Sequence, residues 1–339
     1  MWAFVFSLST PVYVCAAYLL MKKVFIAIII VLILLLGVGG IYVYIPSTLT
    51  VSANSTLHGT VTGSSRALLQ KEKWKTFWAG KKELTPNGAI TVNDLFIYNE
   101  DTFRIAKLLQ NALAITISSG TTRVNSMLRV LPAGRDSVGI NWTYNDTTSN
   151  NPINRLKQYQ QAVTTKKNMD AVLQHITQFL STNKNVYGIS IEQTTTHDTT
   201  LISIYSILNK YPTTDDIYAL VKKLQAYIDA NKALQTGSPM LNITQLDSQR
   251  YKVRVALPTN KILNEQGNIS YNRMIPGDFL STTITGGSAT VDNACRQMQY
   301  YFEDYKRTAM AIPFQVLVTD RSKEADTSKW ITKLYFPVM

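Results

Sequence analysis

The sequence has few of the residues that bind metals or form disulfide frameworks. Its 339 residues include two cysteines, Cys15 and Cys295, and three histidines, His58, His175 and His197. Two cysteines this far apart exclude a disulfide scaffold and a cysteine-based zinc site. The histidines are also too widely spaced for a local metal motif, so we expect neither a metal nor a cofactor.

Common catalytic motifs are missing as well. The sequence contains no G-x-S-x-G elbow, P-loop, H-E-x-x-H pair or dinucleotide-binding fingerprint. Gly286-Gly287 stands before a predicted helix, where a turn is a simpler interpretation than a phosphate cradle. His197-Asp198 lies in a threonine-rich run, which indicates a solvated loop rather than a catalytic dyad. We therefore predict no catalytic residue and favour a binding protein over an enzyme.

A long apolar run dominates the N-terminal part of the sequence. The 22 residues from Val24 to Ile45 carry no charge and are rich in isoleucine, leucine and valine. A helix of that length spans about 33 Å, which is enough to cross the core of a bilayer. Lys22 and Lys23 precede the run, and the next lysine or arginine is Arg66. The positive-inside rule therefore predicts a single-pass anchor over residues 21–46 in a bacterial inner membrane, with the following domains in the periplasm.

A cleaved signal peptide is the alternative to an anchor. Its apolar region has only about 7–15 residues and ends at small residues, whereas this run is longer and ends in Ile-Tyr-Val-Tyr-Ile-Pro. Residues 1–20 are also uncharged, and Met21 followed by two lysines is typical of the start of a bacterial membrane protein. We expect translation to begin at Met21. The alternative is a two-helix hairpin that turns at Lys22-Lys23.

Charge after the anchor is scattered. Residues 47–339 contain 32 basic and 22 acidic residues, a net charge of +10. The densest basic group is most simply a solvated face, with anionic lipid as the alternative contact; it consists of Lys71, Lys73, Lys75, Lys81 and Lys82. A second charged group predicts a solvated hairpin tip whose charges pair with one another; it consists of Asp320, Arg321, Glu324, Asp326 and Lys329. No nucleic acid partner is expected, because the predicted topology keeps the basic residues out of the cytoplasm.

The first soluble block, residues 47–185, has a simple predicted order of elements. Alternating residues predict a strand over 49–57, and a short helix with Trp74 and Trp78 follows over 65–78. Short β-prone runs separated by turn signals then extend from residue 89 to 144. Helical periodicity predicts one long helix over 152–180. We expect Trp74, Trp78 and Trp142 to be core residues rather than ligand contacts.

This order resembles the SRPBCC or START-like helix-grip fold. The resemblance is carried by the element order and by the early helix with Trp74 and Trp78. It implies an α+β domain in which the long helix closes a curved sheet over a deep apolar cavity.

The second soluble block, residues 186–339, contains an internal repeat. Ile217–Ile243 aligns with Val291–Leu317 at a constant offset of 74 residues. Each half predicts a strand, a helix and two more strands: 200–208, 215–232, 240–246 and 251–257, then 278–285, 291–307, 314–319 and 329–338. A duplicated β-α-β-β unit predicts a pseudo-twofold domain with a groove where its halves meet, and such grooves are good ligand sites.

The repeat resembles the gyrase-inhibitor-like (GyrI-like) effector-binding fold. The likeness is carried by Gly286-Gly287, by Pro313-Phe314-Gln315 and by the closing run from Trp330 to Val338. It implies a ligand-sensing module, and the combination of an anchor with both blocks resembles membrane-anchored proteins of Bacteroidetes. Family members that bind cationic drugs carry a glutamate where this chain has Gln315. A glutamine offers hydrogen bonds but no charge, which favours neutral or amphipathic ligands over cations.

We expect the groove to be lined by Gln315, Leu317 and Tyr335; strand alternation puts the first two on one face. The leading hypothesis is a membrane-anchored protein that binds an apolar or amphipathic small molecule. A hydrolase or cyclase that uses the same cavities is the second hypothesis. A structural protein that docks on a protein partner is the third.

Overall fold

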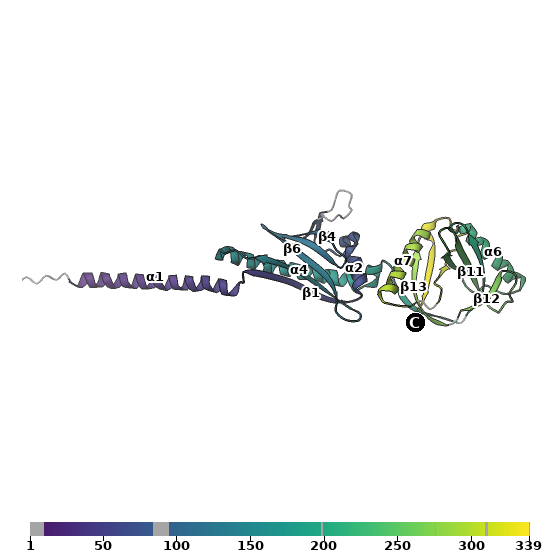
Figure 1. Ribbon diagram of the computed structural model, residues 1–339, viewed down its shortest axis with the longest axis horizontal. Helices are drawn as coiled ribbons and strands as arrows, with labels where there is room; N and C mark the ends of the chain where they lie inside the picture. The colour runs from purple at the N-terminus through teal and green to yellow at the C-terminus, as the bar shows by residue number, and fades with distance from the viewer. Residues whose placement is uncertain (1–9, 84–94, 198, 275, 309–310, 339) are drawn as a thin grey trace, which may run out of the picture. The chain divides into compact units, whose positions relative to one another are not determined.

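The computed structural model describes residues 10–83, 95–197, 199–274, 276–308 and 311–338 (Figure 1). The fold is α+β, with an N-terminal apolar helix and two antiparallel sheets. The chain divides into two compact units. The first consists of the residues up to Ser55, Trp78–Arg129 and Asn141–Gln174, and the second of Thr56–Phe77, Val130–Ile140 and the chain from His175 onward.

The N-terminal helix α1 extends over Thr10–Tyr44. Its part from Met21 to Tyr44 is long and apolar enough to cross a membrane, by length and composition. The helix continues through Lys22 and Lys23 without a break, so the alternative of a hairpin at these lysines is wrong. Residues 1–9 of the segment before Met21 lie outside the described residues.

The first sheet has seven strands in the order β1-β7-β6-β5-β4-β3-β2. Each strand from β2 to β7 pairs with the next, and β1 returns to the edge beside β7. The strands are β1 (Thr48–His58), β2 (Lys81–Glu83), β3 (Leu95–Tyr98), β4 (Asp101–Leu108), β5 (Ala112–Ser119), β6 (Thr122–Pro132) and β7 (Ser137–Thr147). Gly120, with φ of +55°, supports the tight turn between β5 and β6. The strand run expected at 89–92 lies outside the described residues.

Four helices accompany this sheet in the sequence. They are α2 (Val61–Leu69), α3 (Lys71–Phe77), α4 (Pro152–Leu180) and α5 (Asn183–Tyr187). The single early helix expected over 65–78 is in fact two helices that break at Gln70, whereas the long helix has the expected bounds. A strand, short helices, an antiparallel run and a long helix make up a helix-grip arrangement.

Aromatic side chains fill the interior of the first sheet. Trp78 packs against Phe96 and Phe103 with ring centroids 5.1 and 5.3 Å apart, and Phe103 lies 5.5 Å from Trp142. Trp74, Trp78 and Trp142 are all buried, as expected of core residues. A cavity between β5–β7 and α4 has a volume of only about 20 Å³, room for a single water molecule. It is far smaller than the deep cavity that the helix-grip resemblance implies.

The second sheet has eight strands in the order β12-β9-β11-β10-β14-β15-β13-β8. The first half of the repeat is β9 (Thr199–Leu208), α6 (Thr214–Ala230), β10 (Met240–Gln245) and β11 (Tyr251–Thr259). The second half is β13 (Gly277–Thr285), α7 (Ser288–Asp304), β14 (Phe314–Leu317) and β15 (Ile331–Pro337). The duplicated β-α-β-β pattern is confirmed. Two strands outside the repeat, β12 (Ile269–Met274) and β8 (Glu192–Thr196), extend the sheet at its edges.

The register at the centre of the sheet locates the pseudo-twofold axis. β10 pairs with β14 so that Leu241 lies opposite Gln315, and these two residues are equivalent in the 74-residue repeat. The axis therefore passes between them. The helix ends repeat as well, because Lys232 and Lys306 both follow their helices with φ of +52°.

The two faces of this sheet differ. The face that packs against α6 and α7 carries the buried residues of both halves, Val253, Val255 and Leu257 among them. No described helix of the repeat packs on the opposite face, which we call the open face; Tyr205 and Ile207 are exposed there. The alternating burial of β11 follows from this one-sided cover, since successive side chains of a strand point to opposite faces.

Candidate functional site

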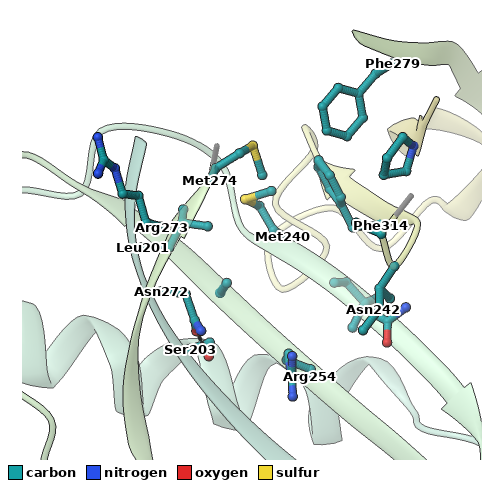
Figure 2. Close-up of a pocket in the computed structure, with 15 residues that line it drawn as sticks. Leu201, Ser203, Met240, Asn242, Arg254, Asn272, Arg273, Met274, Phe279 and Phe314 are labelled. Carbon is teal, nitrogen blue, oxygen red and sulfur yellow. Dashed lines mark hydrogen bonds between the residues drawn. The ribbon is translucent and has the colours of Figure 1, made fainter. Parts of the chain in front are cut away.

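The open face of the second sheet holds a cavity of about 390 Å³ (Figure 2). This volume lies within the range of about 300–1,000 Å³ that small-molecule pockets usually have. We call it the open-face cavity. Its lining side chains come from both halves of the repeat and from β12: Leu201, Ser203, Met240, Leu241, Asn242, Arg254, Ala256, Asn272, Arg273, Met274, Phe279, Ala311, Ile312, Phe314 and Pro337.

Strand alternation and register bring these side chains together. Met240 pairs with Ala256 and Asn242 pairs with Arg254 across β10 and β11. Ala256 in turn pairs with Ser203 of β9. Because residues two apart on a strand share a face, these three neighbouring strands present one continuous patch to the cavity.

Methionine and phenylalanine form the apolar part of the cavity. The side chains of Met240 and Met274 lie between Leu201 on one side and Phe279 and Phe314 on the other (Figure 2). The rings of Phe279 and Phe314 meet edge to face with centroids 5.9 Å apart. Methionine is flexible and polarizable and makes favourable contacts with aromatic rings, so this wall can adapt to different apolar ligands.

Tyr335 lies next to the cavity. Its ring stacks on Phe314, with centroids 5.1 Å apart and planes 11° from parallel, and its centroid is 6.1 Å from that of Phe279. Tyr335 therefore packs against two aromatic residues that line the cavity. Of the three residues that the sequence predicts for the groove, this one lies closest to the open-face cavity.

Polar groups mark the other side of the cavity. The hydroxyl of Ser203 donates to the side-chain oxygen of Asn272. The amide of Asn242 donates to the carbonyl of Pro313 over 2.9 Å. Arg254 and Arg273 both line the cavity, although the guanidinium of Arg273 is directed away from Met240 and Met274 (Figure 2), and the described lining residues include no carboxylate. The electrostatics therefore favour a neutral or anionic group at this end and disfavour a cation.

Gln315 and Leu317 lie on the opposite, helix-covered face. Leu317 is only 1 % exposed and belongs to the core that packs against α6. Gln315 borders a cavity of about 20 Å³ at the pseudo-twofold axis, where Thr214 and Ser288 at the starts of α6 and α7 also lie. The structure therefore separates these two residues from Tyr335. Only a space the size of a water molecule remains beside Gln315.

Arg321 helps to close this axial cavity. It is only 8 % exposed, its Nη2 donates to the hydroxyl of Thr332 over 2.7 Å, and its guanidinium lies 4.8 Å from the ring of Trp330. Burial lowers the pKa of Arg321. The expectation of a fully solvated hairpin tip is therefore wrong at this residue. The charges farther out do pair with one another, as Lys323 does with Asp320 and Lys329 with Asp326.

Sequence reasoning missed the residues that line the open-face cavity. Met240, Met274 and Phe279 belong to different strands, and nothing in their local pattern connects them. Arg254 alternates with buried valines on β11, which marks it as a residue of the opposite face. That alternation was the one available signal.

No protein-family model matches this sequence, and no curated protein matches it. Several solved structures resemble this chain in fold. EcmrR in a complex with DNA is 16% identical, and the match covers 54% of this chain and 69% of that one with a TM-score of 0.41. The C-terminal domain of EcmrR is 16% identical over 44% of this chain and 98% of the domain, with a TM-score of 0.38.

A hydrolase from Listeria innocua is 10% identical, with 44% of this chain and 92% of the hydrolase covered and a TM-score of 0.35. A further protein, SAV2435 bound to tetraphenylphosphonium, is 14% identical over 44% of this chain and 94% of that one, with a TM-score of 0.31. None of these values identifies a ligand or an activity for this chain.

Proposed function

We propose that this chain is a membrane-anchored protein that binds an apolar or amphipathic small molecule in the open-face cavity. The observation that carries the proposal is the cavity of about 390 Å³, which is lined by methionine, phenylalanine and two arginines. A concave site that is mostly apolar, with a few convergent polar groups, is the usual form of a small-molecule site.

Two fold assignments support this function. We assign residues 47–185 to the SRPBCC-like helix-grip domains, because their strands and helices follow the expected order. We assign residues 186–339 to the GyrI-like effector-binding domains, because two β-α-β-β units meet at a pseudo-twofold axis. Both resemblances imply ligand binding, and the second domain offers a cavity of ligand size on its open face.

The anchor is the segment Met21–Tyr44 of α1. It is uncharged after Lys23, and its described side chains face outward rather than into a protein core. The two lysines at its start favour a cytoplasmic N-terminus, with residues 47–339 on the periplasmic side of a bacterial inner membrane.

The cavity chemistry favours a ligand with a ring or chain and a neutral or anionic end. Apolar atoms of the ligand pack against Met240, Met274 and Phe314, where burial contributes about 25 cal/mol per Å² of apolar surface. An anionic end gains charge-assisted hydrogen bonds from Arg254, which are shorter and stronger than neutral ones. A cationic end meets no carboxylate among the described lining residues.

Calorimetric titration of the full chain in nanodiscs tests this function. The probes are 2-naphthoate and 2-naphthylmethylammonium, which share a ring system and differ in charge, and empty nanodiscs give the background. We expect the anion to bind more tightly than the cation. Met240→Ala should weaken binding about tenfold, or 1.4 kcal/mol, while Ile207→Ala, on the same face outside the cavity, should leave it unchanged.

The outcomes separate the hypotheses. Equal loss in both variants would show that the ring does not occupy the open-face cavity. No binding of either probe would shift the assignment toward a protein that docks on a protein partner through the open face.

A further inference from the structure

The end of the apolar helix is fixed to α4 and leads directly into β1, without a long linker. Ile45 is buried, and β1 begins three residues later at Thr48. Arg155 of α4 is also buried, and its Nε and Nη2 both donate to the carbonyl of Ile45, over 2.9 and 2.5 Å. The same guanidinium lies 4.8 Å from the ring of Tyr42. α4 therefore holds the last turn of α1 in place.

Further contacts show how α4 runs beside α1. The hydroxyl of Tyr42 donates to the carbonyl of Asn150, just before α4 begins. The rings of Tyr44 and Tyr159 meet edge to face with centroids 5.9 Å apart. Residues later in α1 contact residues later in α4, so the two helices run in the same direction where they meet. The start of α4 therefore lies level with Tyr42. Figure 1 shows the start of α4 beside the end of α1.

This position brings apolar side chains to the end of the apolar segment. Ile153 is 65 % exposed and Leu156 is 41 % exposed. The two are three residues apart and therefore lie on one side of the helix. Ile153 and Leu156 therefore lie beside the last turn of the segment Met21–Tyr44. If that segment crosses the membrane, the bilayer ends at this level.

The charge around this surface has one sign. The first turns of α4, residues 152–165, contain Arg155 and Lys157 and no acidic residue. Lys157 is exposed one position after Leu156. Exposed aliphatic residues with lysine beside them, at the end of a membrane span, are the features that bind an anionic bilayer surface.

We propose that the first two turns of α4 form a second membrane contact, in which Ile153 and Leu156 insert among the lipid headgroups beside α1. We call this the α4 membrane contact. It rests on the proposed anchor, and it fixes the first unit against the bilayer at two points. Tyr42 and Tyr44 belong to the same contact, since tyrosine favours the headgroup region.

Spin-label accessibility on the full chain tests the proposal. The protein is reconstituted in vesicles of phosphatidylcholine and phosphatidylglycerol, and Cys15 and Cys295 are replaced by alanine. Single labels are placed at Ile153 and Leu156. Collision with oxygen, which concentrates in lipid, is compared with collision with a water-soluble nickel chelate. Ile30 in the apolar segment serves as the lipid control, and exposed Lys167, about 21 Å farther along α4, serves as the water control.

We expect Ile153 and Leu156 to favour oxygen over the chelate several-fold more than Lys167 does. Chelate access at Ile153 and Leu156 equal to that at Lys167, with Ile30 shielded, would overturn the α4 membrane contact and leave the anchor intact. Chelate access at Ile30 would overturn the anchor, and the α4 membrane contact with it. Shielding of Ile153 that is lost when the protein is diluted at constant lipid-to-detergent composition would indicate a second copy instead of lipid and also overturn the proposal.

Discussion

The two sheets of this protein differ in how tightly side chains pack on their faces. The first sheet packs tryptophan and phenylalanine rings against one another and leaves a cavity of about 20 Å³ beside α4. The second sheet packs its two helices on one face and retains a cavity of about 390 Å³ on the other. Interlocked aromatic rings fill a space and stabilise it, whereas flexible methionines surround a space that a ligand can enter.

Each sheet region also holds a buried carboxylate, and the two differ in their partners. Asp304 is paired with Arg66 over 2.8 Å, and the hydroxyl of Tyr187 also donates to it. Asp101 accepts from Asn168, but its Oδ1 has no hydrogen-bond partner among the described residues. We therefore expect the two carboxylates to contribute very differently to stability.

The largest expected effect is at Trp142. Its indole is buried against Phe103, and its Nε1 donates to the hydroxyl of Ser126 over 2.9 Å. Trp142→Ala leaves a cavity that the surrounding rings cannot close, so we expect a loss of about 3–5 kcal/mol in the free energy of unfolding. Chemical denaturation measures it. A loss below 1 kcal/mol would mean that the first interior is looser than the structure indicates.

A matched pair on β10 sharpens the contrast between the two faces. Leu241 borders the open-face cavity but is only 1 % exposed and belongs to the core that packs against α6, while the side chain of its neighbour Met240 lies in the cavity. Leu241→Ala should cost about 2–4 kcal/mol of unfolding free energy, and Met240→Ala less than about 1 kcal/mol, because its site is already partly empty. Denaturation of both variants under one condition tests the difference. Equal losses would contradict the assignment of an open face.

The paired and unpaired carboxylates give the third prediction. Asp304→Asn removes the partner of a bidentate, partly buried Arg66, and we expect a loss of about 2–3 kcal/mol. Asp101→Asn keeps one side-chain oxygen at a buried site that has no ion pair among the described residues, so the unfolding free energy should change by less than about 1 kcal/mol. The reverse order of these two losses, measured by denaturation at pH 7, would contradict the partner assignments.

The smallest predicted effect is a pH dependence at Lys73. Burial, and next the charge of Arg66, lower the pKa of Lys73 from 10.5 to about 8. Above pH 8 the unfolded chain therefore holds a proton there that the folded chain releases, so this lysine makes stability rise with pH. Between pH 8 and 9 the gain should be at most about 1 kcal/mol, since the amine is only partly buried.

Lys73→Met removes the gain and serves as the comparison for that measurement. The window stops at pH 9 because burial raises the pKa of Cys295 to about 11, and a raised thiol pKa makes stability fall above its ordinary value of 9. A stability curve that is identical in both proteins between pH 8 and 9 would contradict the prediction.

Much of the architecture could be predicted from the sequence. The long helix from Pro152 to Leu180 follows from its helical period, and the repeat of 74 residues predicts two equivalent β-α-β-β units with their helices in place. These features depend on local periodicity, which each segment carries by itself. The break at Gln70 was missed, because helix ends depend on single hydrogen bonds rather than on a period.

The candidate site was harder to predict. Strand alternation correctly indicates that Gln315 and Leu317 share a face, but it does not say which face the helices cover. The structure puts Leu317 in the core and opens the other face, where Met240 and Phe314 lie. Arg321 was assigned to solvent from its charged neighbours, yet Trp330 and Thr332 enclose it.

The sequence by itself therefore determined the elements, the apolar segment and the duplication, because these arise from patterns along the chain. The tertiary structure decided which side of the second sheet is open, which aromatic rings fill the first interior, and how Arg155 holds the end of α1. Those features arise where residues far apart in the chain meet. Their energies depend on packing and burial that no local pattern contains.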